Sequence, residues 1–192
     1  YSGKCYISQE DCGRSANRGE CAQYCRLSYD LEDAAGNVLL RNKHLLSLKD
    51  MDRSERLQEL IDAGVHSFKI EGRLKDVSYV KNITAYYRQQ LDRLQGQKTS
   101  LGTCTFFFRP DPQKTFHRDQ TGYFPENGRF TEPVHQWYTP KSTGEYLGKI
   151  NRVFPGGFET NAVVNTGDGL CFTLPDGTFS GFSVNRVEDR KS

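Results

Sequence analysis

The chain has 192 residues, of which 35% are hydrophobic and 26% charged, and its formal net charge is +2. This composition excludes a wholly disordered chain, and aromatic residues at 12% can build a core for one or two domains. The balanced charge neither requires nor excludes a nucleic-acid partner, because a local basic patch does not show in the total. No apolar run approaches the roughly 20 residues of a membrane helix, so no membrane span is expected.

Four of the six cysteines lie in the first 25 residues, spaced C-x6-C-x8-C-x3-C. They are compatible with disulfides, with a metal or cluster site, or with plain thiols. The chain begins at Tyr1 rather than Met and shows no secretion signal, so we expect a cytoplasmic piece of a longer protein. A reducing compartment favours thiolate ligands for zinc or an iron–sulfur cluster. The predicted metal ligands are Cys5, Cys12, Cys21 and Cys25.

Three arginines, Arg14, Arg18 and Arg26, are interspersed with these cysteines or follow them. Nearby cations favour the thiolate form of cysteine and offset the charge of a cluster. The same arginines are equally compatible with a solvated basic loop.

Residues 29–97 show alternating strand and helix signals. Residues 29–41 predict a hairpin, because Gly36 and Asn37 tolerate positive φ. Two short strands are expected at 44–50 and 65–73. A helix is predicted from Ser54 as N-cap to Gly64, with Leu57, Leu60 and Ile61 on one face, and Asp76 is expected to cap a longer helix. This order favours an α/β unit at the end of a larger barrel.

Charged residues alternate through "SFKIEGRLK" (67–75), at the end of the strand predicted at 65–73. Barrel enzymes place their active sites at the carboxyl ends of strands, so Lys69, Glu71 and Arg73 are candidate catalytic residues that would bind an anion or phosphate. Gly72 would let backbone or ligand approach closely. The alternative is a solvent-facing strand end with a Lys–Glu pair.

The composition changes after Gln97. Residues 98–143 hold five of the seven prolines and predict an extended segment that wraps another surface. Aromatic residues with arginines in 105–110 and 121–130 can stack on RNA bases or pack the segment onto its neighbour. Residues 144–192 contain short β-rich runs separated by "PGG", "NTGDG" and "PDG", which predicts a small all-β barrel.

The histidines give no support for a peptidase. His44, His66, His117 and His135 lie in neither a Gly-x-Ser-x-Gly turn nor a His-Glu-x-x-His helix. A lone histidine of this kind is more often structural than catalytic.

The motifs "GKCYIS", "GRSANRGECAQYCR", "LLSLKD" and "SFKIEGRLKDVSYVKNITAYYR", in this order, closely resemble the U32 peptidase family. The tail, from "TPKSTGEYLGKI" to "GFSVNRV", is similar to the collagenase-like extension of its longer members. The resemblance implies a C-terminal portion: the end of a TIM-like barrel at 1–97, a linker at 98–143 and a small β-barrel at 144–192. The fold class is thus α/β plus all-β.

Two activities attach to this family. One is peptidase or collagenase activity. The other is hydroxylation with a [4Fe–4S] cluster and a small anionic co-substrate such as prephenate. In the branch that this sequence resembles most, the hydroxylated group is a cytidine of 23S ribosomal RNA. The resemblance implies cluster binding by Cys5 and Cys21. Met51 stands where some members have a ligand, so Cys25 and Cys12 are the local candidates for the remaining positions. A non-catalytic RNA-binding or scaffold module is the third alternative.

Overall fold

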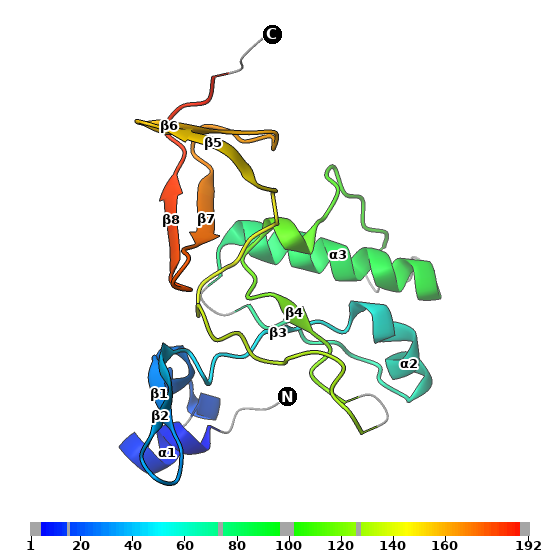
Figure 1. The fold of residues 1–192 in the computed structure, drawn as a ribbon. Helices are drawn as coiled ribbons and strands as arrows, with labels where there is room; N and C mark the ends of the chain where they lie inside the picture. Colours follow the sequence, from blue (N-terminus) through cyan, green and yellow to red (C-terminus); the bar gives the residue numbers. More distant parts are fainter. Residues whose placement is uncertain (1–4, 15, 73–74, 97–101, 126–127, 189–192) are drawn as a thin grey trace.

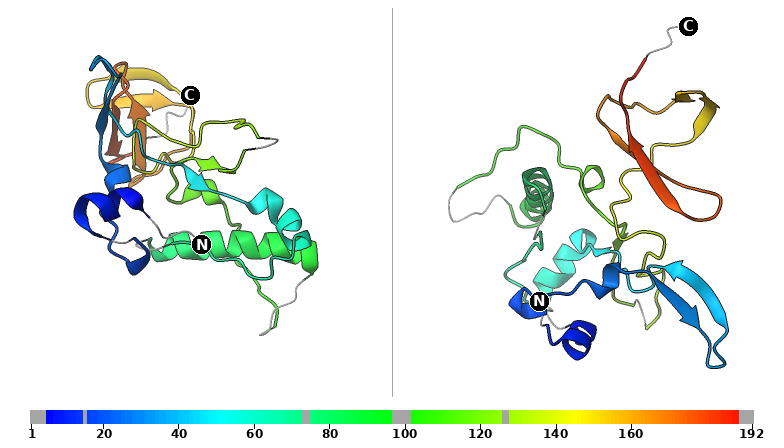
Figure 2. Two further views of the ribbon diagram at one scale, coloured as in Figure 1. Left: turned by 90° about the horizontal axis from the view of Figure 1, so that it is seen from below. Right: turned by 90° about the vertical axis from the view of Figure 1, so that its left-hand side faces the viewer.

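The computed structural model describes residues 5–14, 16–72, 75–96, 102–125 and 128–188 (Figure 1). A cysteine-rich loop and a hairpin lie at one end, two further hairpins lie at the other, and two helices lie between them on one side (Figures 1 and 2). Helix α1 spans Tyr6–Cys12, and short 3-10 turns follow at Ala16–Arg18 and Tyr24–Arg26. No helix among the described residues is long and apolar enough to cross a membrane.

The predicted hairpin is confirmed. Strands β1 (Tyr29–Glu32) and β2 (Val38–Lys43) pair antiparallel. The Asp33 carboxylate accepts hydrogen bonds from the backbone N–H groups of Ala35 and Asn37, each at 2.9 Å. Gly36 has a φ of 82°, which a residue with a side chain rarely adopts. Asn37 contributes through its side-chain amide, which donates a hydrogen bond to the Asp33 carboxylate.

The predicted buried strand at 44–50 is wrong. Ser47 N–H donates to His44 O at 3.0 Å and so closes a turn, and Leu46 and Leu48 are 39% and 42% exposed. Only β3 (Asp50–Met51) is a strand, and it pairs in parallel with β4 (Gln120–Thr121). Three backbone hydrogen bonds attach the rest: His44 N to Trp137 O, Gln136 N to Ser47 O, and Lys49 N to Val134 O, with an isolated antiparallel bridge between Leu48 and His135.

The second predicted strand, at 65–73, is also not found over its described residues, 65–72. A strand is stable when its backbone N–H and C=O groups pair with a neighbouring strand, and no described strand pairs with these residues. The parallel α/β unit is therefore reduced to the two-residue β3–β4 ladder. Whether a barrel forms around it stays a prediction.

The first helical region begins differently from the prediction. The Asp52 carboxylate, not the Ser54 hydroxyl, accepts the free backbone N–H, that of Ser54, at 2.9 Å. A 3-10 turn at Ser54–Arg56 then leads into α2 (Leu57–Asp62). Gly64, with a φ of 90°, donates to Ile61 O at 2.9 Å and ends the helix as predicted.

Helix α3 (Val77–Gln95) is the longest element, and its predicted cap is confirmed: the Asp76 carboxylate accepts the backbone N–H of Tyr79 at 2.7 Å. The helix packs on α2, where Leu57 and Ala85 are each 2% exposed. Its predicted apolar stripe is only partly covered within this chain, because Val77 is 70% exposed.

The segment from 102 to 143 lies against this helical region and holds a 3-10 turn at Pro112–Lys114. Asn82 of α3 binds the backbone of Asp111 on both sides: its Nδ2 donates to Asp111 O, and its Oδ1 accepts from Asp111 N at 2.8 Å. This amide pair ties the extended segment to the helix.

The C-terminal strands are confirmed as two antiparallel hairpins. Strand β5 (Ile150–Phe154) pairs with β6 (Gly157–Thr160), and β7 (Gly169–Thr173) pairs with β8 (Phe179–Ser183). Phe182 joins them, with its ring 5.6 Å from that of Phe158 and 6.0 Å from that of Phe172. Among the described residues they form separate two-stranded sheets, so closure into a barrel stays a prediction.

Asn82→Ala should lower the free energy of unfolding by about 1–3 kcal/mol, because it leaves the partly buried Asp111 backbone N–H without an acceptor. Urea unfolding followed by circular dichroism measures this. Lys81→Ala, at the neighbouring exposed position, should change it by less than about 0.5 kcal/mol. Equal effects of the two substitutions would show that the Asn82–Asp111 pair does not hold the segment.

Candidate functional site

The cysteine loop, residues 5–25, is organised around one buried side chain. Ser8 of α1 is 0% exposed. Its hydroxyl accepts the backbone N–H of Ala22 at 3.3 Å, and its carbonyl accepts the Cys12 thiol at 3.1 Å and the backbone N–H of Arg14 at 3.0 Å. Ser8 therefore ties the start of the loop to the residue beside Cys21.

The four predicted metal ligands are all free thiols. Cys5 and Cys25 are partly exposed, and Cys12 and Cys21 are exposed. The hydroxyl of Ser8, followed by its backbone N–H, lowers the pKa of Cys5 from its ordinary value. A lower pKa raises the thiolate fraction, which is the form that binds metals.

This donor set is chemically suited to zinc or to an iron–sulfur cluster, because each takes cysteine thiolates. The arrangement is more open than a closed site: over the described ranges, no three His, Cys, Asp or Glu side chains lie close enough together to hold a metal ion.

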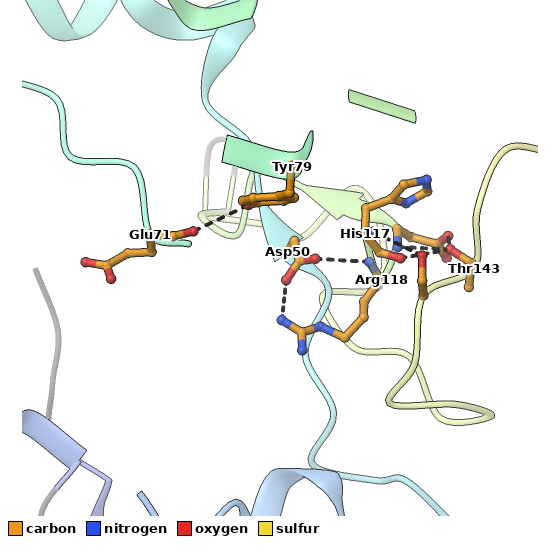
Figure 3. A network of polar contacts seen from close by, with 8 residues as sticks. Asp50, Glu71, Tyr79, His117, Arg118 and Thr143 are labelled. Carbon is orange, nitrogen blue, oxygen red and sulfur yellow. Dashed lines mark hydrogen bonds and ion pairs between the residues drawn. The ribbon is translucent and has the colours of Figure 1, made fainter. Parts of the chain in front are cut away.

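A polar network lies at the centre of the molecule (Figure 3). The Asp50 carboxylate accepts the guanidinium of Arg118 in an ion pair and also its backbone N–H, at 3.0 Å. Asp119 accepts the hydroxyl of Thr143 at 2.9 Å, and Thr143 N–H donates to His117 O at 3.0 Å. The network thereby joins β3, the residues before β4 and the end of the extended segment.

Two cations flank the ring of Phe116. The Lys75 ammonium lies 2.9 Å from the ring centroid, and the guanidinium carbon of Arg118 lies 5.5 Å from it. Burial, and then the Arg118 charge, lower the pKa of Lys75, and the Arg26 charge acts in the same direction; Asp50 opposes them. Arg26 directly follows Cys25, so this group of charges adjoins the cysteine loop.

Two of the predicted catalytic residues, Lys69 and Glu71, are placed apart from this group. Lys69 and Glu71 form an ion pair at 3.1 Å with side chains 67% and 68% exposed, and Figure 3 shows the Glu71 side chain turned away from Asp50. Arg73 lies outside the described residues. Gly72 does permit a close approach, since a Cβ there would lie 3.2 Å from the ring of Tyr79. The pair has the geometry of the solvent-facing alternative.

Sequence reasoning missed Asp50, Phe116 and Arg118. Asp50 and Arg118 are 68 residues apart in sequence, and Arg118 stands in an irregular aromatic stretch with no period to reveal it. The one available signal was Lys75, which continues the alternating charges of residues 69–73.

A cavity of about 500 Å³ lies on another face, between the start of α2 and the aromatic residues of 121–130. Phe124 is 60% exposed, and its ring centroid lies 5.5 Å from the guanidinium carbon of Arg53. The ring of Tyr123 packs edge to face on that of Phe124, with 5.4 Å between the centroids. In the other aromatic stretch, Phe107 is 98% exposed. These rings are available for contact with RNA bases, which stays a prediction.

Three of the four histidine rings have partners other than a nucleophile. His117 binds Gln113 O at 3.2 Å, His44 binds Leu27 O at 3.2 Å, and His135 stacks on Trp137 at 4.9 Å. In the part of the chain that the structure describes, no hydrogen bond joins a histidine ring to a Ser, Thr or Cys side chain.

Ser8→Ala should shift the pH dependence of Cys5 alkylation to higher pH, because loss of the hydroxyl hydrogen bond raises the lowered pKa of Cys5 toward its ordinary value. At a fixed pH below that value the thiolate fraction falls and labelling slows severalfold. Iodoacetamide labelling followed by peptide mass spectrometry measures this, with exposed Cys104 in the same sample as the reference. An unchanged Cys5 profile would contradict the role of Ser8.

Comparison with known proteins adds the family. Residues 1–132 match Peptidase family U32. A 23S rRNA 5-hydroxycytidine C2501 synthase of Escherichia coli is 47% identical, covering 98% of this chain and 29% of the relative. A collagenase of Porphyromonas gingivalis is 38% identical, covering 98% and 53%, and tRNA hydroxylation protein P1 of Bacillus subtilis is 30% identical, covering 78% and 37%.

The chain thus spans between about a third and a half of the length of these relatives. No solved structure shows a significant match to it. The family match covers well over half of the chain and includes the cysteine loop, helices α2 and α3, and the Asp50–Arg118 pair. This chain belongs to peptidase family U32.

Proposed function

We propose that this chain is part of an iron–sulfur protein that hydroxylates a base in RNA, with the cytidine of 23S ribosomal RNA as the first substrate to test. The observation that supports it most is the 47% identity, over 98% of the chain, to a relative named for that product. A second relative is named for tRNA hydroxylation. A ribosomal substrate also favours a cytoplasmic location.

The cysteine loop is the proposed binding site of the cluster. Cys5, Cys12, Cys21 and Cys25 are free thiols on one loop, and the lowered pKa of Cys5 favours its thiolate form. A [4Fe–4S] cluster would supply electron transfer when bound. Ser8 would hold two parts of the loop together during binding, because its carbonyl accepts the Cys12 thiol and its hydroxyl accepts the N–H of Ala22, next to Cys21.

The other proposed parts are an anionic co-substrate, such as prephenate, and the RNA itself. Lys69, Glu71 and Arg73 remain the proposed binders of an anion on sequence grounds, and Lys75 and Arg118 add two cations near Asp50. The exposed rings of Phe124 and Tyr123 beside Arg53 suit stacking on unpaired bases.

Peptidase activity is the competing assignment, since a relative at 38% identity is named collagenase. It needs a nucleophile activated by a base or a metal-bound water. Three of the four histidine rings, those of His44, His117 and His135, bind backbone oxygen or stack on Trp137, so they give the peptidase assignment no support.

Anaerobically purified full-length protein, and this chain, should show a broad visible absorption band with iron and sulfide in equal amounts. Cys5→Ser and Cys21→Ser should lose most of both, whereas Cys104→Ser, an exposed cysteine outside the loop, should retain them. Bound zinc without iron would overturn the cluster and indicate a structural site. Iron that persists in both loop variants would contradict the ligand assignment.

Deleting the gene should remove 5-hydroxycytidine from 23S rRNA, measured by nucleoside mass spectrometry, and the wild-type gene should restore it. The Cys5→Ser gene should not, while the Cys104→Ser gene should. Unchanged RNA together with gelatin cleavage by the purified protein would replace hydroxylation by the peptidase assignment.

A further inference from the structure

Arg118 is ion-paired with Asp50 and lies, like Lys75, at the ring of Phe116. These two side chains and Arg26, whose charge acts on Lys75, are named the cation cluster. Lys75 interacts electrostatically with both arginines and with two carboxylates, Asp50 and Asp76. The cations therefore outnumber the carboxylates by three to two. Asp76 is also committed as the cap of α3, where it accepts the backbone N–H of Tyr79.

The hydrogen-bonding capacity of the cluster is not used up. Arg118 donates one guanidinium nitrogen to Asp50, but its buried Nε has no hydrogen-bond partner among the described residues. Arg26 likewise has a buried guanidinium nitrogen, Nη1, without a partner there. A buried N–H of a charged group that makes no hydrogen bond is destabilising, so each of these atoms needs an acceptor.

Lys75 is held in an unusual way for a lysine with acidic neighbours. Its ammonium lies over the face of Phe116, 2.9 Å from the ring centroid, and 5.8 Å from that of Tyr79. An aromatic face attracts a cation but does not neutralise it. The Lys75 charge therefore stays available to a ligand. Burial and the two arginines disfavour the charged form of Lys75, and a bound anion would favour it.

We propose that the cation cluster binds an oxyanion, a carboxylate or phosphate group, between Arg26, Lys75 and Arg118. A guanidinium offers planar paired N–H donors that match the oxygens of such a group, and Lys75 adds a point charge. Because Arg26 follows Cys25 directly, a bound anion would lie next to the cysteine loop. For its role as the co-substrate site, this inference rests on the proposed function.

The test uses inorganic phosphate and succinate as probes, with sodium chloride at matched ionic strength. Either probe should raise the unfolding temperature of this chain, in a saturable way, beyond the effect of chloride, because a ligand that binds the folded state stabilises it. Lys75→Met should weaken the apparent affinity at least tenfold and Arg26→Gln should do the same. Lys81→Met, an exposed lysine on α3, is the matched control and should bind like the wild type.

No stabilisation beyond chloride, or equal binding by Lys75→Met and the wild type, would overturn the site. Lys75→Met keeps an unbranched side chain over Phe116, so it carries the test if Arg26→Gln does not fold. Tighter binding of succinate would assign a small carboxylate ligand to the site. Tighter binding of phosphate would assign a phosphate group, and competition by a short single-stranded RNA would then show that the phosphate belongs to the nucleic acid. Anion binding by a protein that holds no iron would support this site and contradict the proposed function. Iron and sulfide without anion binding would contradict this site and leave the proposed function intact.

Discussion

The position of Asp50 is the constraint on which the centre of this structure depends. Its carboxylate accepts both the side chain and the backbone N–H of Arg118, while its own N–H donates to Asp119 O at 3.1 Å. Only three hydrophobic side chains are buried among the described residues: Leu57, Ala85 and Val184. With so little apolar surface removed from water, charge-assisted hydrogen bonds carry an unusual share of the organisation.

The elements that sequence reasoning located correctly are those whose signals lie within a few residues. The turn at Asp33–Gly36, the Asp76 cap of α3 and the glycine-containing turns of the C-terminal hairpins are local chemistry. The strand expected at 44–50, and the described part, 65–72, of the strand expected at 65–73, were not found, because a strand depends on partners that can come from anywhere in the chain. Ser54 and Asp52 are both good capping residues, and only the backbone geometry decides between them.

The candidate site divides in the same way. The cysteines were found because their spacing is local, yet the role of Ser8 as their common support was not, since it requires the loop to be closed onto Ala22. The cation cluster depends on the Asp50–Arg118 ion pair and on the charges that act on Lys75, and no pattern in the sequence connects these residues. Lys75 and Arg118 are ordinary charged residues until the fold places both at one aromatic ring, that of Phe116.

The parallel pairing of Asp50 with Gln120 has a kinetic consequence. This contact closes a loop of about 70 residues, and such a closure costs chain entropy before it gains any stabilising bond. The hairpins β1–β2, β5–β6 and β7–β8 and helix α3 need no such closure. We therefore expect these elements to form first in refolding, and the Asp50–Arg118 centre, with the cation cluster built on it, to form in the slowest step.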